Sequence, residues 1–489
     1  MATCRRLLDS PPLQIFALAL ALRLLVAVLT ANLYDPDEFV YLTLARAVAH
    51  GAVPYRDFVF FHPPGFLIIL RALNPLITLW WPSARIAGML VDSLTAVVVW
   101  RLGRQLYGRK EALAAGLIYA ANPVAMITSV RVLQEPYVTF AGVAALTLLL
   151  ARRSVWSAAG AGILVGIAVW IKYPALIFLG AGMLANPRRV LPLVAAAAAT
   201  IALLFAPEAA LFHRFWSDTV LWQLSRPAGA FSDRLRITVS FLVLANPLVL
   251  FAWRERRWFL WFGYAAGAVF LLASHTYYHY FLLSVPFAAL LGAPVAVRVL
   301  RVIRNRYWVD RLRAASAGLA IANRHYDTQW GVGTRWSAGD SGLTERGLRI
   351  SRREIAAAAL ALATLWGAGV GLAGPGTTLV SSAALSTVAP VARYLDRLSH
   401  PGQAILGDRF EYAFLAGRVP YDDYYWNLVR SIRPRHLEAD LDARAVVRTG
   451  GEWQSFPPGL VHYLSRHYPH FHVGTATVWD VARRRDHEG

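Results

Sequence analysis

The sequence predicts a polytopic α-helical membrane protein with about eleven transmembrane helices. Of its 489 residues, 57% are hydrophobic and only 16% are charged. Many apolar runs approach the ~20 residues that a helix needs to cross the hydrocarbon of a bilayer. Basic residues are concentrated in the short connections between these runs. The predicted spans are 12–33, 84–103, 111–129, 136–151, 156–172, 173–187, 190–207, 237–253, 257–273, 277–297 and 355–373.

The basic connections fix the orientation. Short cytoplasmic loops carry an excess of arginine and lysine, so the N-terminus is expected inside and the C-terminus outside. The first run, 12–33, is long and is expected to be a retained helix rather than a cleaved signal peptide. Topology also accounts for the net charge of +20, so no nucleic-acid partner is expected. The single cysteine, Cys4, excludes an internal disulfide, a Cys-ligated zinc site and an Fe–S cluster.

The apolar run 65–81 is predicted to lie in the membrane interface rather than to span. It contains Arg71, Asn74 and Pro75 and ends in Trp80-Trp81-Pro82, which suits an amphipathic segment at the surface of a bilayer. Counting it as a span would place every later basic loop on the opposite side. The first exoplasmic loop therefore covers 34–83, and a loop of that length usually carries function.

Two regions are predicted to lie outside the membrane. The cytoplasmic loop 298–354 is rich in arginine, which suits a segment near anionic lipid. From residue 374 onward, strand-like pieces at 403–408, 443–449 and 475–481 alternate with helix-like ones, which indicates a small α/β lobe on the exoplasmic side. The chain is thus divided into a transmembrane domain, 1–373, and an exoplasmic lobe, 374–489.

Asp37 and Glu38 lie where the first apolar run ends and an amphipathic helix begins. The simpler interpretation is a helix N-terminus, with one acid as the cap and another in the first turn. Capping explains poorly why three acids, Asp35, Asp37 and Glu38, occur within four residues. A carboxylate beside an apolar surface is well suited to act as a general base.

Further along the same loop, His62 precedes two prolines. The prolines can simply redirect the chain, with His62 an ordinary interface residue. Alternatively, they fix His62 at the outer membrane surface, near lipid phosphates. The motif is informative mainly because an acidic pair precedes it.

Three more charged residues lie at the outer ends of predicted helices. Arg131 and Glu135 are spaced i and i+4, so they can pair on one helix face, which would be a simple surface pair. Lys172 is either an anchor that reaches to the interface or a fixed positive charge beside a lipid phosphate.

His275 and His279 have the same i, i+4 spacing. The pair could bind a metal, although no acidic third ligand lies on that segment. The neighbouring tyrosines fit an aromatic belt at the membrane interface equally well.

Together these motifs resemble the type C membrane glycosyltransferases, specifically the bacterial relatives of protein O-mannosyltransferases and of lipid A aminoarabinose transferases. The resemblance is carried by "DPDEFVYLTLARAVAHGAVPYRDFVFFHPPG", "RVLQEP", the isolated Lys172 and "YYHYFLLSVP", within roughly residues 12–300. It implies a polyprenyl-phosphate-linked sugar donor, an acceptor outside the membrane and inversion at the anomeric carbon.

The resemblance also implies residue roles. Asp37 would be the base that activates the acceptor, Glu38 would support it, and His62 would lie near the donor phosphate or the acceptor. Glu135 would be the second acidic position. This chain has no lysine around its His-Pro-Pro motif, unlike those relatives, so neutralisation of the phosphate falls to Lys172, Arg131 and His279. The full set of predicted substrate-binding residues is His62, Arg131, Glu135, Lys172, His275 and His279. The metal-binding residues are left unknown; no cofactor is certain, and a divalent metal is left open.

The expected function is therefore an inverting glycosyltransferase in a bacterial plasma membrane, with its active site on the exoplasmic side. The acceptor would be protein, lipid or polysaccharide. No nucleotide-binding loop is visible, which suits a lipid-linked donor. The main alternative is a transporter or flippase of a lipid-linked saccharide, although no inverted repeat is visible. A non-catalytic assembly subunit is a second alternative.

Overall fold

A computed structural model of the chain describes residues 10–152, 154–225, 230–272, 276–302, 383–400, 403–407, 410–417, 419–420, 443–448, 458–474 and 476–481. Most of them are helical. The first half contains α2 (Pro11–Leu29), β1 (Leu33–Tyr34), α3 (Pro36–Ala49), α4 (Gly65–Leu79), α5 (Ser83–Leu106), α6 (Arg109–Ala120), α7 (Pro123–Ser129), α8 (Glu135–Ala151), α9 (Val155–Ile171), η1 (Tyr173–Ala175), α10 (Leu176–Ala185), η2 (Pro187–Arg189) and α11 (Val190–Phe205).

Shorter and less regular helices follow α11. They are η3 (Ala206–Leu211), α12 (Phe212–Trp216), η4 (Ser217–Leu221), α13 (Trp222–Ser225), α14 (Phe231–Val239), η5 (Ser240–Leu244), η6 (Pro247–Phe251), α15 (Trp258–Ala265) and η7 (Ala266–Leu272). A long apolar helix, Tyr278–Val302, comes next and begins as the 3-10 helix η8 (Tyr278–Ser284).

The apolar helices identify a polytopic membrane protein. Among the described residues, four helices are long and apolar enough to span, or five if the bent pair α6 and α7 forms one span. Helix α8 packs between α5 and α9, and α11 packs on α9. In the helical segment Pro187–Glu208, only 11% of the most apolar stretch of 18 residues is buried inside the protein. The leucines of this segment are therefore available to face lipid. The count of eleven spans and their orientation stay predictions.

The predicted helix 111–129 is broken in two. Helices α6 and α7 meet at a 50° bend. Pro123 lacks the backbone N–H that a continuous helix needs, and the side chain of Asn122 caps the new start by accepting hydrogen bonds from the backbone N–H groups of Val124 and Ala125 at 3.0 and 3.4 Å. Cap and proline together explain why the helix restarts in a new direction.

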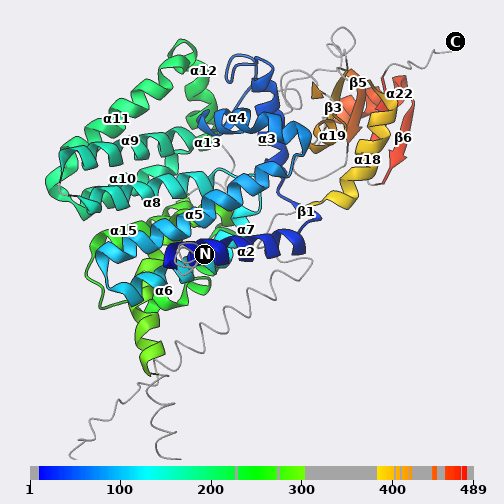
Figure 1. The fold of residues 1–489 in the computed structure, drawn as a ribbon. Coiled ribbons are helices and arrows are strands. Elements are labelled where there is room, and N and C mark those ends of the chain that lie inside the picture. Colours follow the sequence, from blue (N-terminus) through cyan, green and yellow to red (C-terminus); the bar gives the residue numbers. More distant parts are fainter. Residues whose placement is uncertain are drawn as a thin grey trace, which may run out of the picture.

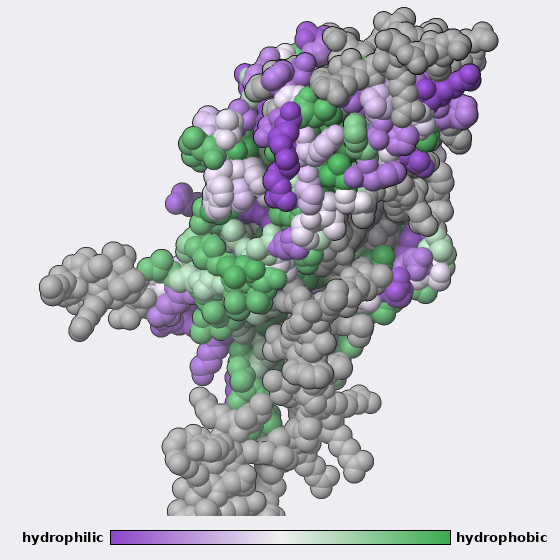
Figure 2. All heavy atoms as spheres, turned by 90° about the vertical axis from the view of Figure 1, so that its right-hand side faces the viewer, coloured by the Kyte–Doolittle hydropathy of each residue, from purple (hydrophilic) through white to green (hydrophobic). Residues whose placement is uncertain are grey.

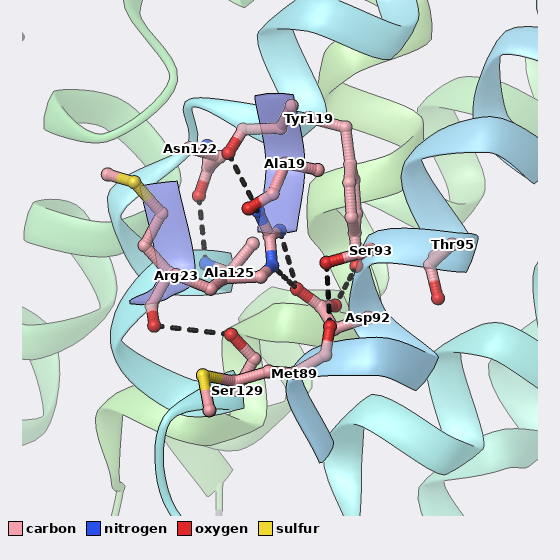
Figure 3. A network of polar contacts seen from close by, with 12 residues as sticks. Ala19, Arg23, Met89, Asp92, Ser93, Thr95, Tyr119, Asn122, Ala125 and Ser129 are labelled. Carbon is pink, nitrogen blue, oxygen red and sulfur yellow. Dashed lines mark hydrogen bonds and ion pairs between the residues drawn. The ribbon is translucent and has the colours of Figure 1, made fainter. Parts of the chain in front are cut away.

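A buried ion pair ties α2 to α5 and α6 (Figure 3). Arg23 Nε donates to Asp92 Oδ2 at 2.7 Å, and Tyr119 donates its hydroxyl to Asp92 Oδ1 at 2.5 Å. Arg23 Nη1 also donates to the carbonyls of Ala19 and Ala120. All three polar side chains are fully buried, so each charge depends on these partners.

The C-terminal described residues include a mixed five-stranded sheet of order β4-β3-β5-β7-β6. Its strands are β3 (Ala404–Gly407), β4 (Val419–Pro420), β5 (Ala443–Arg448), β6 (His470–Val473) and β7 (Ala476–Asp480), and its helices are α18 (Leu385–Leu398), α19 (Phe410–Leu415) and α22 (Pro458–His467). We call these elements the C-terminal unit. It lies at one end of the molecule, next to α3 (Figure 1). Viewed from that side, its surface is mostly hydrophilic, and hydrophobic residues gather below it (Figure 2).

Several predictions fall outside the described residues. They are the span 355–373, nearly all of the loop 298–354 and the boundary between 373 and 374. Helix α4 covers most of the predicted interfacial run 65–81, and Leu76, Leu79 and Trp80 at its end are exposed. Its placement in the interface stays a prediction.

The predicted orientation is tested by cysteine labelling in a Cys4→Ser background. His50, at the end of α3, is exposed and lies in the predicted exoplasmic loop, and Lys110 is exposed at the start of α6 on the predicted cytoplasmic side. We expect a membrane-impermeant maleimide to label His50→Cys in intact cells and Lys110→Cys only after the membrane is opened. The reverse pattern would invert the topology.

Candidate functional site

Three acids of the first loop, Asp35, Asp37 and Glu38, lie at the start of helix α3. Asp35 is its N-cap: the side chain accepts a hydrogen bond from the backbone N–H of Asp37 at 3.0 Å, and Pro36 starts the helix. Asp35 is buried and also accepts the hydroxyl of Tyr278 at 3.3 Å. Burial, followed by the charge of Asp37, raises the pKa of Asp35 well above its usual range. Capping therefore accounts for Asp35, whereas Asp37 and Glu38 lie in the first turn.

Glu38 is completely buried between two arginines. Arg85, at the start of α5, donates from Nε at 3.1 Å and from Nη2 at 2.6 Å to Glu38 Oε2. On the other side, Arg131 Nε lies 3.8 Å from Glu38 Oε1. Arg131 is 1% exposed, and its Nε has no hydrogen-bond partner among the described residues. Glu38, in the first turn of α3, thus lies between two buried guanidinium groups, that of Arg85 at the start of α5 and that of Arg131 between α7 and α8.

Glu135, at the start of α8, pairs with Lys172 at the end of α9. His279 Nε2 lies 3.8 Å from Glu135 Oε1, and the Lys172 ammonium lies 4.6 Å from the ring centroid of Tyr280. Glu135 Oε2 and His279 Nδ1 are buried and have no hydrogen-bond partner in the described part of the chain. This second cluster therefore keeps polar atoms available for a further polar group.

The predicted pair of Arg131 and Glu135 is wrong. Residues 130–134 are not helical, because α7 ends at Ser129 and α8 begins at Glu135. The i, i+4 geometry of a helix therefore does not apply. Arg131 faces Glu38, and Glu135 faces Lys172. Both residues are also buried rather than exposed at the surface.

The loop that carries His62 is held by Tyr55. The Tyr55 hydroxyl donates to the carbonyl oxygen of His62 at 2.6 Å, and the Tyr55 backbone N–H donates to the carbonyl of Phe58 at 2.7 Å. Tyr55 has φ of 66°, a left-handed conformation that costs free energy for a residue other than glycine. The His62 ring lies beside Tyr41, with centroids 6.2 Å apart.

The first loop and the second cluster meet around Tyr41, on α3. Burial raises the pKa of the Tyr41 hydroxyl well above its usual range, and the charges of Asp37 and Glu135 raise it further. A Cβ atom on Gly65 would lie 2.6 Å from the carbonyl oxygen of Trp170. The turn after His62 therefore packs closely against the end of α9, which carries Lys172.

The structure thus brings together most of the residues that the sequence predicted: Asp37, Glu38, His62, Arg131, Glu135, Lys172 and His279. His275 lies outside the described residues. Within the described residues, no group of three or more metal-ligating side chains is close enough to hold a metal ion. The sequence reasoning missed Arg85 and Tyr278. Arg85 could have been found from its position, because it lies at the outer end of a predicted span, whereas arginines usually lie at the cytoplasmic ends.

This arrangement suits chemistry on an anionic substrate at the membrane surface. Buried cations stabilise a leaving phosphate most strongly where water is excluded. Of the four clustered acids, Asp35, Glu38 and Glu135 are buried, whereas Asp37 is only half-buried. Asp37 is therefore the carboxylate that an incoming hydroxyl group reaches most readily.

Known proteins share a sequence pattern and the fold with this chain. Residues 61–211 match the model of the dolichyl-phosphate-mannose-protein mannosyltransferase family. The structure is similar to ArnT from Cupriavidus metallidurans in the apo state, with 16% identity, a TM-score of 0.62 and coverage of 95% of this chain and 97% of ArnT. ArnT bound to undecaprenyl phosphate matches with 15% identity, a TM-score of 0.57 and the same coverage.

A third similar structure is the oligosaccharyltransferase AglB from Archaeoglobus fulgidus, in complex with an inhibitory peptide and a dolichol-phosphate. It matches with 12% identity and a TM-score of 0.52 over 94% of this chain and 72% of AglB. No curated protein sequence matches significantly. The family model and the shared fold confirm the resemblance to type C membrane glycosyltransferases.

Proposed function

We propose that this membrane protein is an inverting glycosyltransferase that moves a sugar from a polyprenyl-phosphate carrier to an acceptor on the outer face of a bacterial plasma membrane. The observation that carries the proposal is the meeting, around α3 and the first loop, of the half-buried Asp37 with two buried charged clusters, Arg85–Glu38–Arg131 and Lys172–Glu135–His279. A base and cations for a leaving phosphate are the groups that this transfer needs.

In the proposed reaction, Asp37 accepts the proton of an acceptor hydroxyl group as its oxygen attacks the anomeric carbon. The bond between that carbon and the phosphate oxygen breaks, and the polyprenyl phosphate leaves with the electron pair. One displacement inverts the configuration. Asp35 caps the helix that presents Asp37, and Glu38 keeps Arg85 and Arg131 in place.

Arg131 is the best candidate to bind the donor phosphate. Lys172 already has a closely paired carboxylate, and Arg85 contacts Glu38 through two nitrogens. Arg131, by contrast, lies 3.8 Å from its carboxylate. Its guanidinium can therefore donate to an anion without first breaking a close pair. His62 and His279 complete the proposed donor and acceptor surroundings.

We expect Arg131→Gln to raise the KM for the donor about tenfold or more, because a hydrogen bond to a charged group contributes about 1.5–3 kcal/mol. Arg131→Lys should lose less, since it keeps the charge. Initial rates at varied donor concentration measure both. Arg56→Gln is a matched control in the first loop, because Arg56 is exposed and pairs with Asp57. An unchanged KM in Arg131→Gln would remove Arg131 from the donor site.

The proposed donor class is tested with membranes that contain the full chain. Undecaprenyl-phosphate mannose, glucose, galactose and arabinose, each labelled in the sugar, are supplied one at a time, and label in acceptors is counted. We expect one member to donate its sugar. The corresponding nucleotide sugars should donate none in extracts depleted of polyprenyl phosphate. Transfer from a nucleotide sugar under those conditions would contradict the proposal.

A further inference from the structure

The C-terminal unit touches the acid-bearing helix directly. Tyr34, the residue before the cap Asp35, donates its hydroxyl to Glu411 Oε1 of α19 at 2.5 Å. Tyr34 is 0% exposed and Glu411 is 2% exposed. A hydrogen bond to a buried carboxylate is among the stronger ones in proteins, so this contact fixes the chain immediately before α3.

Backbone pairing strengthens the same connection. Strand β1 pairs antiparallel with β2 (Ala383–Ala384), with Leu33 opposite Ala384 and Tyr34 opposite Ala383. One residue earlier, Asn32 accepts the backbone N–H of Leu385 at 2.7 Å through its carbonyl. The start of α18 is thereby joined to the segment that leads into α3.

A third contact lies along α3 itself. The Phe39 ring packs against Phe414 of α19 with centroids 5.5 Å apart, and the Arg46 guanidinium lies 4.1 Å from the centroid of the same ring. Phe39 follows Asp37 by two residues, which is about 200° around a helix at about 100° per residue. The C-terminal unit therefore packs against the side of α3 that is opposite Asp37.

We infer that the C-terminal unit is a working part of the active site and that Tyr34 and Glu411 are positioning residues for Asp37. The inference rests on the proposed function, because it assigns Asp37 as the base. Phe414 of the C-terminal unit packs against the side of α3 opposite Asp37, and Glu411 accepts the hydrogen bond of Tyr34 just before the helix begins. The hydrogen bond from Arg85 of α5 to Glu38 fixes a further side of α3. These contacts fix the position and orientation of Asp37 relative to the acceptor hydroxyl group.

The structure offers a matched control. Tyr107 donates its hydroxyl to Glu255 Oε2 at 2.9 Å. It is the same pair of side-chain types, and it joins the end of α5 to the segment before α15, outside the site. Tyr34→Phe and Tyr107→Phe each remove one hydroxyl group and keep the ring. They differ in whether the lost bond holds α3.

The experiment measures kcat, the KM for the donor and the melting temperature of the full chain, with the active undecaprenyl-phosphate sugar as the probe. We expect Tyr34→Phe to lower kcat about three- to tenfold with KM within about twofold, because displacement of a catalytic group slows the chemical step more than binding. Tyr107→Phe should leave kcat unchanged. Glu411→Gln should resemble Tyr34→Phe, and the double variant should be no slower than the slower single one, since the two side chains act through one contact.

Three results would overturn the inference: an unchanged kcat in Tyr34→Phe, an equal loss in Tyr107→Phe, or additive losses in the double variant. If Tyr34→Phe does not fold, an unchanged kcat in Glu411→Gln overturns it equally. An Asp37→Asn arm separates the two proposals. Activity in Asp37→Asn contradicts the base assignment, whereas an inactive Asp37→Asn beside an unaffected Tyr34→Phe contradicts only the role of the C-terminal unit.

Discussion

Asp37→Asn should reduce sugar transfer by about 10²- to 10⁴-fold, the range that a positioned general base contributes. Asparagine keeps the size and polarity of the side chain but cannot accept the proton of the acceptor hydroxyl group. The backbone N–H of residue 37 still donates to Asp35, so the helix cap remains intact. We therefore expect the KM for the donor and the melting temperature to stay close to the wild-type values. Initial rates in membranes with a saturating undecaprenyl-phosphate sugar measure the loss.

Asp57→Asn is the matched control. Asp57 lies in the same loop, but its carboxylate is exposed and pairs with Arg56. Hydrogen bonds, first from Arg56 and then from the backbone of Val53, lower its pKa to about 2. It is therefore ionised and engaged, unsuited to serve as a base, and its variant should keep most of the activity. A rate in Asp37→Asn above about one tenth of wild type would be too high for loss of the base.

The second large effect concerns stability. Arg23→Leu should destabilise the protein by about 3–5 kcal/mol, because it leaves Asp92 as a buried charge without its partner. Tyr119 would still donate to Asp92 (Figure 3), but one hydroxyl group does not neutralise a carboxylate. Thermal unfolding of detergent-purified protein, followed by loss of helical circular dichroism, measures the change.

Removal of both charges tests the cause of this loss. Arg23→Leu combined with Asp92→Leu should be more stable than Arg23→Leu alone, since replacing a whole buried ion pair with apolar side chains is often nearly neutral. Arg236→Ala is the surface control: its pair with Asp233 is more than half exposed on both sides, and exposed pairs contribute little. A double variant as unstable as the single one would show that Asp92 is not the source of the loss.

The sequence predicts the composition of the site better than its pairing. Asp37 and Lys172 were predicted because charged residues at the ends of apolar runs are rare and therefore informative, and His62 was predicted from the His-Pro-Pro motif that follows the acidic pair. Their partners depend on how the helices pack. The i, i+4 spacing of Arg131 and Glu135 misled because α7 ends at Ser129 and α8 begins only at Glu135, so the residues between them are not helical. Local spacing is evidence of contact only where the helix is continuous.

The contact of Tyr34 with Glu411 was beyond sequence reasoning for another reason. The two residues are 377 positions apart, and neither belongs to a periodic pattern that identifies a partner. In the C-terminal unit, by contrast, local patterns located several elements well: β3, β5 and β7 coincide with the strand-like pieces 403–408, 443–449 and 475–481. Strand propensity acts locally, whereas docking of the unit on α3 depends on surfaces that form only after folding.

The central claim is that the donor is a sugar carried on polyprenyl phosphate. The most direct test is a profile of lipid-linked sugars in a strain from which this chain is deleted. We predict that one polyprenyl-phosphate sugar accumulates there. It should return to its normal level when the wild-type chain is restored and stay high when Asp37→Asn is supplied instead. A deletion strain with an unchanged profile, or one that Asp37→Asn restores fully, would contradict the account.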